Sequence, residues 1–151
     1  MSLQNYTQII FRDITSLGSL YIYMIIALIF LFLGDYVLFL RFGFGAVFTF
    51  LISVIIRLIY FKERPNKQEY SNLFEKIDAG SFPSIHAARA SFMFLILNNY
   101  FQNILIAIFL LLIALLVLYS RIYLKKHDIV DVGGGIIIGL VLGFLALNFI
   151  V

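Results

Sequence analysis

Residues 104–118 read ILIAIFLLLIALLVL and contain no charged or polar side chain. A helix that crosses the hydrocarbon core of a bilayer needs about 20 mostly apolar residues, and the flanking residues extend this stretch to that length. Hydrophobic residues make up 63% of the 151 residues and charged residues only 13%, against about 25% charged residues in a typical soluble domain. We therefore predict an all-α membrane protein.

Further apolar stretches extend this prediction to a bundle of about five transmembrane helices in a single domain, 1–151. Residues 2–17 mix apolar and polar side chains, which is typical of an amphipathic helix at the membrane interface or of a frayed start to the first span. Because Asp13 stands where a signal peptide has a basic cluster, we expect no cleaved leader. The predicted spans cover about 19–40, 44–61, 83–97, 103–121 and 131–151.

The composition also limits the chemistry and the partners of the chain. With no cysteine and only two histidines, the chain excludes disulfides and thiolate chemistry, and its composition argues against a histidine-rich metal site. We expect no metal and no cofactor. The net charge of +3 favours membrane lipids with anionic headgroups over nucleic acid. The sequence leaves the oligomeric state open.

Five spans place the two strongly polar segments, 57–86 and 120–131, on one face of the membrane. The first segment contains Arg57 and Arg64, which are seven residues apart and thus lie on one face if the helix continues. Both arginines could then bind one anion. Alternatively, Arg57 extends its side chain to the interface and Arg64 is an ordinary loop charge.

A second cluster, Pro83-Ser84-Ile85-His86, resembles a helix start. Pro83 suits the first helical position, which places Ser84 and His86 in the first turn. Free backbone N–H groups there attract anions, and both side chains add hydrogen-bond donors. A plain capping sequence with an incidental histidine is the alternative.

The third cluster contains Ser120, Arg121, His127 and Asp131. His127 and Asp131 are four residues apart, as on one helical face. A carboxylate on one imidazole nitrogen sets the tautomer and leaves the other nitrogen free to attack, while the guanidinium of Arg121 suits phosphate oxygens. A chance pair in a solvated turn is the alternative.

Taken in order, the clusters resemble the signature of the type 2 phosphatidic acid phosphatase superfamily: Lys-x6-Arg-Pro, Pro-Ser-Gly-His and Ser-Arg-x5-His-x3-Asp. The resemblance covers residues 57–139, within a motif-bearing core of about 44–151. Arg57 stands in place of the family's lysine and Ile85 in place of its glycine. Members of this family often have six spans, which leaves two alternatives: one N-terminal span is missing, or residues 2–17 replace it. The matching positions are Arg64, Pro65, Pro83, Ser84, His86, Ser120, Arg121, His127 and Asp131.

The resemblance implies a metal-independent membrane enzyme that hydrolyses lipid phosphates such as phosphatidate, phosphatidylglycerophosphate or a polyprenyl diphosphate. By resemblance, His127 forms a phosphohistidine, Asp131 orients it, and His86 protonates the leaving group and then activates water. The implied phosphate ligands are Arg57, Arg64, Ser84, Ile85 and Arg121. A lipid phosphotransferase and a non-catalytic lipid-phosphate binding or transport protein are the alternatives.

Two indications about the side of the membrane that carries the site point in opposite directions. Lysines outside the motifs lie on the same face as the motifs, which on the positive-inside rule indicates the cytoplasm. Family members that recycle lipid carriers act on the outer face. We expect a multi-pass protein of the cell membrane with an extracytoplasmic site.

Overall fold

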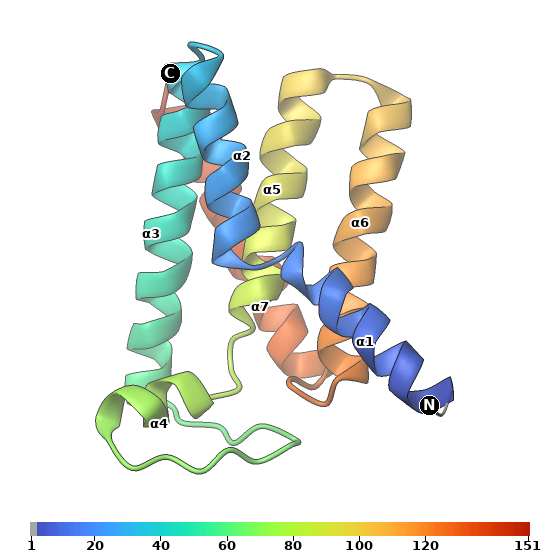
Figure 1. The fold of residues 1–151 in the computed structure, drawn as a ribbon. Coiled ribbons are helices and arrows are strands. Elements are labelled where there is room, and N and C mark those ends of the chain that lie inside the picture. Colours follow the sequence, from blue (N-terminus) through green and yellow to red (C-terminus); the bar gives the residue numbers. More distant parts are fainter. Residues whose placement is uncertain (1–2) are drawn as a thin grey trace.

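The computed structural model describes residues 3–151 (Figure 1). Within that range the chain forms seven helices and no β-strand, apart from one isolated bridge between Glu63 and Gly80. The predicted all-α fold is confirmed. The helices are α1 (Leu3–Ser16), α2 (Leu20–Phe32), α3 (Tyr36–Ile59), α4 (Leu73–Ala79), α5 (Ile85–Phe101), α6 (Ile104–Tyr123) and α7 (Ile129–Phe149).

Within residues 3–151, four helical stretches are long and apolar enough to cross a membrane. They are Asn5–Phe32, which contains α1 and α2, and the helices α3, α6 and α7. The shorter α5 runs through the middle of the bundle, where nine of its 17 residues are buried. With α5, the bundle agrees with the predicted number of about five.

The first two predicted spans had the wrong boundary. We expected a helix to residue 40 with Asp35 inside it, but α2 ends at Phe32 and α3 begins at Tyr36. Gly34 has a φ of +80°, in the left-handed region that glycine favours. The Asp35 side chain accepts a hydrogen bond from the Leu38 N–H at 3.0 Å and so caps α3.

The N-terminal residues form a helix of their own, as predicted for an amphipathic segment. Helix α1 leaves α2 at an angle and lies against one end of α6 (Figure 1). The Phe11 ring packs on Tyr119 and Tyr123, with ring centroids 5.5 and 4.2 Å away. The location of α1 in the membrane interface stays a prediction.

The tightest helix pair is α5 with α7. A Cβ atom added to Gly135 would lie 2.4 Å from the Ser84 carbonyl oxygen, and one added to Gly139 would lie 2.2 Å from the Ala88 carbonyl oxygen. Only glycine allows this approach, so Gly135 and Gly139 let the two helices pack closely. The pair holds the N-termini of both helices at one end of the bundle.

That end also carries the long connection between α3 and α5. Residues 62–83, which lie between two of the predicted spans, contain α4, and the Glu63–Gly80 bridge pairs the two arms of the connection. The opposite end is closed by Arg41, whose Nε donates to the Ile150 carbonyl at 3.1 Å. The polar segments thus converge at one end of the molecule (Figure 1).

Candidate active site

A cleft with about 620 Å³ of empty space opens among α3, α5, α6 and the α6–α7 connection. Most of the predicted site residues line it, although they come from segments far apart in the chain. Ser84 and Asp131 do not line it and are completely buried. The predicted residues that line it are Arg57, Arg64, Ile85, His86, Arg121 and His127, and they are joined by Leu20, Phe50, Asp78 and Arg89.

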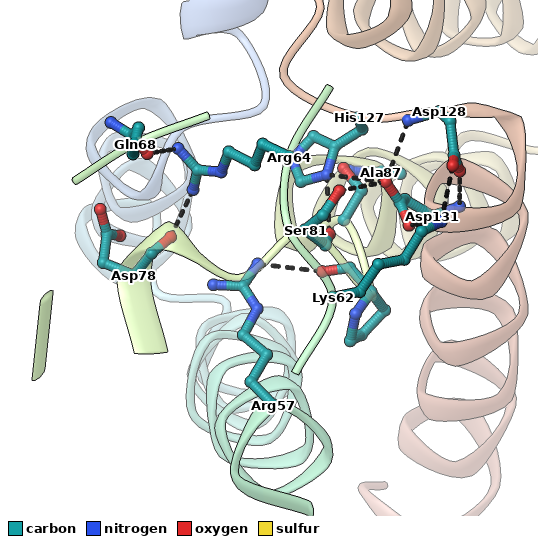
Figure 2. Close-up of polar contacts among 12 residues, drawn as sticks. Arg57, Lys62, Arg64, Gln68, Asp78, Ser81, Ala87, His127, Asp128 and Asp131 are labelled. Carbon is teal, nitrogen blue, oxygen red and sulfur yellow. Dashed lines mark hydrogen bonds and ion pairs between the residues drawn. The ribbon is translucent and has the colours of Figure 1, made fainter. Parts of the chain in front are cut away.

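His127 lies in the connection before α7 and is 2% exposed. Its Nδ1 donates to the Ser81 carbonyl at 2.8 Å, whereas the Asp131 carboxylate is 3.8 Å from Nδ1 (Figure 2). The expectation that Asp131 sets the tautomer directly from the same helical face is therefore corrected, because α7 begins only at Ile129. A main-chain carbonyl sets the tautomer and leaves Nε2 unprotonated.

The imidazole of His127 is held in its neutral form. Burial, followed by the positive charges of Arg121 and Arg64, lowers the pKa of His127 to about 2, and the hydrogen bond to Ser81 opposes this shift without offsetting it. A neutral imidazole retains the lone pair that a nucleophile needs.

Asp131 acts behind His127 as the centre of a hydrogen-bond network. Its carboxylate accepts hydrogen bonds from the Ser81 hydroxyl, the Asp128 N–H at 2.9 Å and the Lys62 ammonium at 2.7 Å (Figure 2). Asp131 thereby holds Ser81, and the carbonyl of Ser81 holds His127. Asp128 and Asp131 also cap α7 reciprocally.

Lys62 joins the two carboxylates of this network, because its ammonium also contacts Asp128 at 2.6 Å. Burial favours a lower pKa for Lys62, but the hydrogen bonds to Asp128 and Asp131 outweigh it and raise the pKa. Lys62 therefore stays charged beside a fully buried carboxylate.

Arg57 and Arg64 reach the cleft by different routes. Because α3 ends at Ile59, they do not share a helical face, and this expectation was wrong. Arg57 donates to the carbonyls of Ile77 and Pro83 at 3.1 and 3.0 Å. Arg64 lies on the bridged connection.

The guanidinium of Arg64 is directed towards Gln68 and Asp78 (Figure 2). It donates to the Gln68 side-chain oxygen and to the Asp78 carbonyl. Arg121, from the last turn of α6, donates to the Thr15 hydroxyl of α1 at 2.8 Å.

Each arginine of the cleft has at least one hydrogen-bond donor without a partner among the described residues. No carboxylate lies within ion-pair distance of any of them in the described part of the chain. Buried, unpaired guanidinium groups attract an anion such as phosphate. A buried Nε without a hydrogen-bond partner is found in Arg57, Arg64, Arg89 and Arg121.

The start of α5 differs by two residues from the prediction, because the helix begins at Ile85 and not at Pro83. Ser84, not Pro83, borders the helix: its hydroxyl caps α5 by accepting from the Ala87 N–H at 3.4 Å, and its own N–H donates to the Asp131 carbonyl at 3.0 Å. The structure thus separates the Ser84 side chain from the other predicted phosphate ligands. Ile85 and His86, whose first-turn N–H groups have no acceptor within the helix, do line the cleft.

Sequence reasoning missed the supporting residues Lys62, Ser81 and Asp128. The Asp-x-x-Asp pattern at 128–131 was readable as a helix cap, but nothing in the spacing linked it to Lys62. No group of three or more histidine, aspartate or glutamate side chains that could hold a metal ion occurs in residues 3–151.

Two comparisons relate the chain to known proteins. Residues 38–151 match the family model of the PAP2 superfamily. Undecaprenyl-diphosphatase BcrC of Bacillus subtilis (strain 168) is 31% identical over 108 residues, which is 71% of this chain and 55% of that protein. The chain thus spans about half the length of this curated relative. No solved structure matches the chain. Because the family match covers most of the chain and confirms the resemblance seen in the motifs, the protein belongs to the PAP2 superfamily.

Proposed function

We propose that this protein is a membrane phosphatase that removes a terminal phosphoryl group from lipid phosphates, with His127 as its nucleophile. The observation that carries the proposal is a buried, neutral imidazole in a cleft of unpaired guanidinium groups. A curated relative is named as an undecaprenyl-diphosphatase, which supports a lipid diphosphate as the substrate class.

In the first step, the lone pair of His127 Nε2 forms a P–N bond with the terminal phosphorus. The P–O bond to the leaving group breaks, and its electron pair stays on the leaving oxygen. His86, which lines the same cleft, gives a proton to that oxygen. Arg57, Arg64 and Arg121 stabilise the charge on the equatorial oxygens.

In the second step, water attacks the phosphohistidine. His86 accepts a proton from this water, the P–N bond breaks, and its electron pair returns to Nε2 as orthophosphate leaves. No metal takes part, because the guanidinium groups supply the positive charge. Asp131 takes no proton and keeps Ser81, and through it His127, in place.

The test is phosphate release by the purified protein in detergent, with and without a chelator. The substrates are farnesyl diphosphate, farnesyl monophosphate, phosphatidate and phosphatidylglycerophosphate. We expect His127→Asn to lower kcat by at least about 1,000-fold, as is typical when a nucleophile is removed, and the wild type to form an acid-labile phosphoenzyme. Lys67→Met, at an exposed lysine, is the control.

Hydrolysis at the wild-type rate by His127→Asn contradicts the nucleophile, and activity that disappears with the chelator contradicts the metal-free mechanism. Transfer of phosphate to an added alcohol instead of water indicates a phosphotransferase. Binding of lipid phosphate without turnover indicates a non-catalytic protein.

A further inference from the structure

Arg89 is the one arginine of the cleft that the family motifs leave unexplained. It lies one turn after His86 on α5 and is 6% exposed. Its guanidinium makes no hydrogen bond or ion pair with the described residues, and its buried Nε has no partner. A buried charge without a partner is costly for the fold, so a purely structural role does not account for it.

Arg89 also lines a second hollow, with about 660 Å³ of empty space, between α2 and α3. Apart from Arg89, this groove is lined by apolar side chains only. Leu20 and Phe50 line both the groove and the cleft, so the two hollows adjoin and Arg89 lies where they meet. The remaining groove residues are Met24, Ala46, Val47 and Leu51.

This arrangement separates the parts of a lipid substrate. The phosphoryl group under attack lies beside His127, while the apolar tail requires an apolar environment and finds one in the groove. The part of the substrate that joins the two passes Arg89. In a lipid diphosphate that part is a second, charged phosphate, and in a monophosphate it is an uncharged ester link.

We propose that Arg89 binds the lipid-linked phosphate of a diphosphate substrate, whose tail occupies the α2–α3 groove, and thereby selects lipid diphosphates over lipid monophosphates. The inference rests on the proposed function and names its substrate class. When the bond between the bridging oxygen and the terminal phosphorus breaks, the electron pair stays on that oxygen. Until His86 protonates that oxygen, negative charge builds up on the lipid-linked phosphate, and a fixed guanidinium stabilises it.

The test compares farnesyl diphosphate with farnesyl monophosphate, which share one tail. We expect Arg89→Met to lower kcat/KM for the diphosphate by about 30-fold, the loss typical of one charge-assisted hydrogen bond, and for the monophosphate by less than about 3-fold. Arg89→Lys is expected to retain part of the preference for the diphosphate over the monophosphate. Arg41→Met, the same substitution at the opposite end of the bundle, leaves the ratio unchanged.

The melting temperature in detergent separates this role from a structural one. Because Arg89 makes no hydrogen bond or ion pair with the described residues, Arg89→Met is expected to melt no lower than the wild type. Equal losses with both substrates, or an unchanged diphosphate rate, overturn the proposal.

Binding separates this inference from the proposed hydrolysis. In the His127→Asn background, calorimetry measures the Kd of the same two lipids with and without Arg89→Met. If the wild type hydrolyses neither lipid, the proposed function fails. If the protein binds the diphosphate more tightly than the monophosphate and Arg89→Met abolishes this difference, the subsite is supported even without hydrolysis. If Arg89→Met leaves the difference unchanged, the subsite is refuted.

Discussion

At the scale of single residues, the site depends on groups that hold His127 as much as on His127 itself. Asp131 is fully buried, and its charge is compensated by Lys62 at 2.7 Å and by the hydroxyl and amide that donate to it. Lys62 is thus the counter-charge of the network behind the nucleophile. Its removal leaves a buried carboxylate with too few partners.

We therefore expect Lys62→Met to lower the free energy of unfolding by about 1–3 kcal/mol, the cost of leaving a buried polar group unsatisfied. Phosphate release should fall as well, because Ser81 and His127 lose their support. The matched control is Lys67→Met, since Lys67 pairs with Glu63 on the surface and such pairs contribute little. Equal melting temperatures and rates for both variants would show that Lys62 is an ordinary surface charge.

The neutral state of His127 predicts a pH dependence of stability. Its pKa is about 2 in the folded protein against 6.5 ordinarily, so below pH 6.5 the unfolded chain binds a proton that the folded protein excludes. Stability should be complete above pH 6.5 and fall towards pH 2, by at most about 1.4 kcal/mol per pH unit for this one group.

Melting temperatures from pH 7.5 to pH 4.5 measure this effect. His127→Asn keeps an amide that can donate to the Ser81 carbonyl but does not titrate, so it should lose less stability on acidification than the wild type. Parallel curves would contradict a neutral His127 in the folded protein.

At the scale of helices, the α5–α7 pair positions the site because both helices begin there. The Ser84 N–H donates to the Asp131 carbonyl at 3.0 Å, which joins the start of α5 directly to the first turn of α7. Gly139 maintains the close approach deeper in the bundle. A change in the distance between these helices should therefore displace the residues that line the cleft.

Gly139→Ala should cost about 1–3 kcal/mol of stability, as overpacking typically does, and reduce phosphate release, because the new Cβ would meet the Ala88 carbonyl. Gly133→Ala is the matched control: it is in the same helix, where an added Cβ contacts nothing within 4 Å. Alanine there should keep or slightly raise the melting temperature, because it favours the helix. If both variants behave alike, close packing at Gly139 is not required.

At the scale of the whole molecule, the two ends of the bundle differ in chemistry. The cleft and its network occupy one end, and the opposite end carries the α2–α3 turn, the α5–α6 turn and the C-terminus (Figure 1). Lys62 at the cleft end is paired with carboxylates, and Arg57, Arg64, Arg89 and Arg121 line the cleft. These basic residues have roles within the protein, which weakens the positive-inside rule as a guide to orientation.

We predict that the cleft end faces the outside of the cell. Because the chain contains no cysteine, a single introduced cysteine is the only thiol that a labelling reagent can modify, and its labelling reports on which side of the membrane its end of the bundle lies. Ser71→Cys, in the exposed part of the α3–α5 connection, should react with a membrane-impermeant maleimide in intact cells. Asn99→Cys, at the opposite end, should react only after permeabilisation. The reverse pattern would place the cleft in the cytoplasm.

The sequence by itself determined the fold class and most residues of the candidate site. The uninterrupted apolar run at 104–118 requires a membrane-like environment, and three spaced motifs led to residues that now line one cleft, such as Arg57, His86 and His127. Hydropathy and local spacing are properties of neighbouring residues, so they can be read without the fold.

Only the tertiary structure decided how these residues are held. Lys62 and Asp131 are separated by 69 positions and His127 and Ser81 by 46, and no periodicity relates such distant residues. Arg64 reaches the cleft through a paired connection and not along a helix, and Arg89 lies between the cleft and the groove because α2, α3 and α5 meet there. Such contacts depend on how helices pack, which is set by the whole chain and not by any single segment of it.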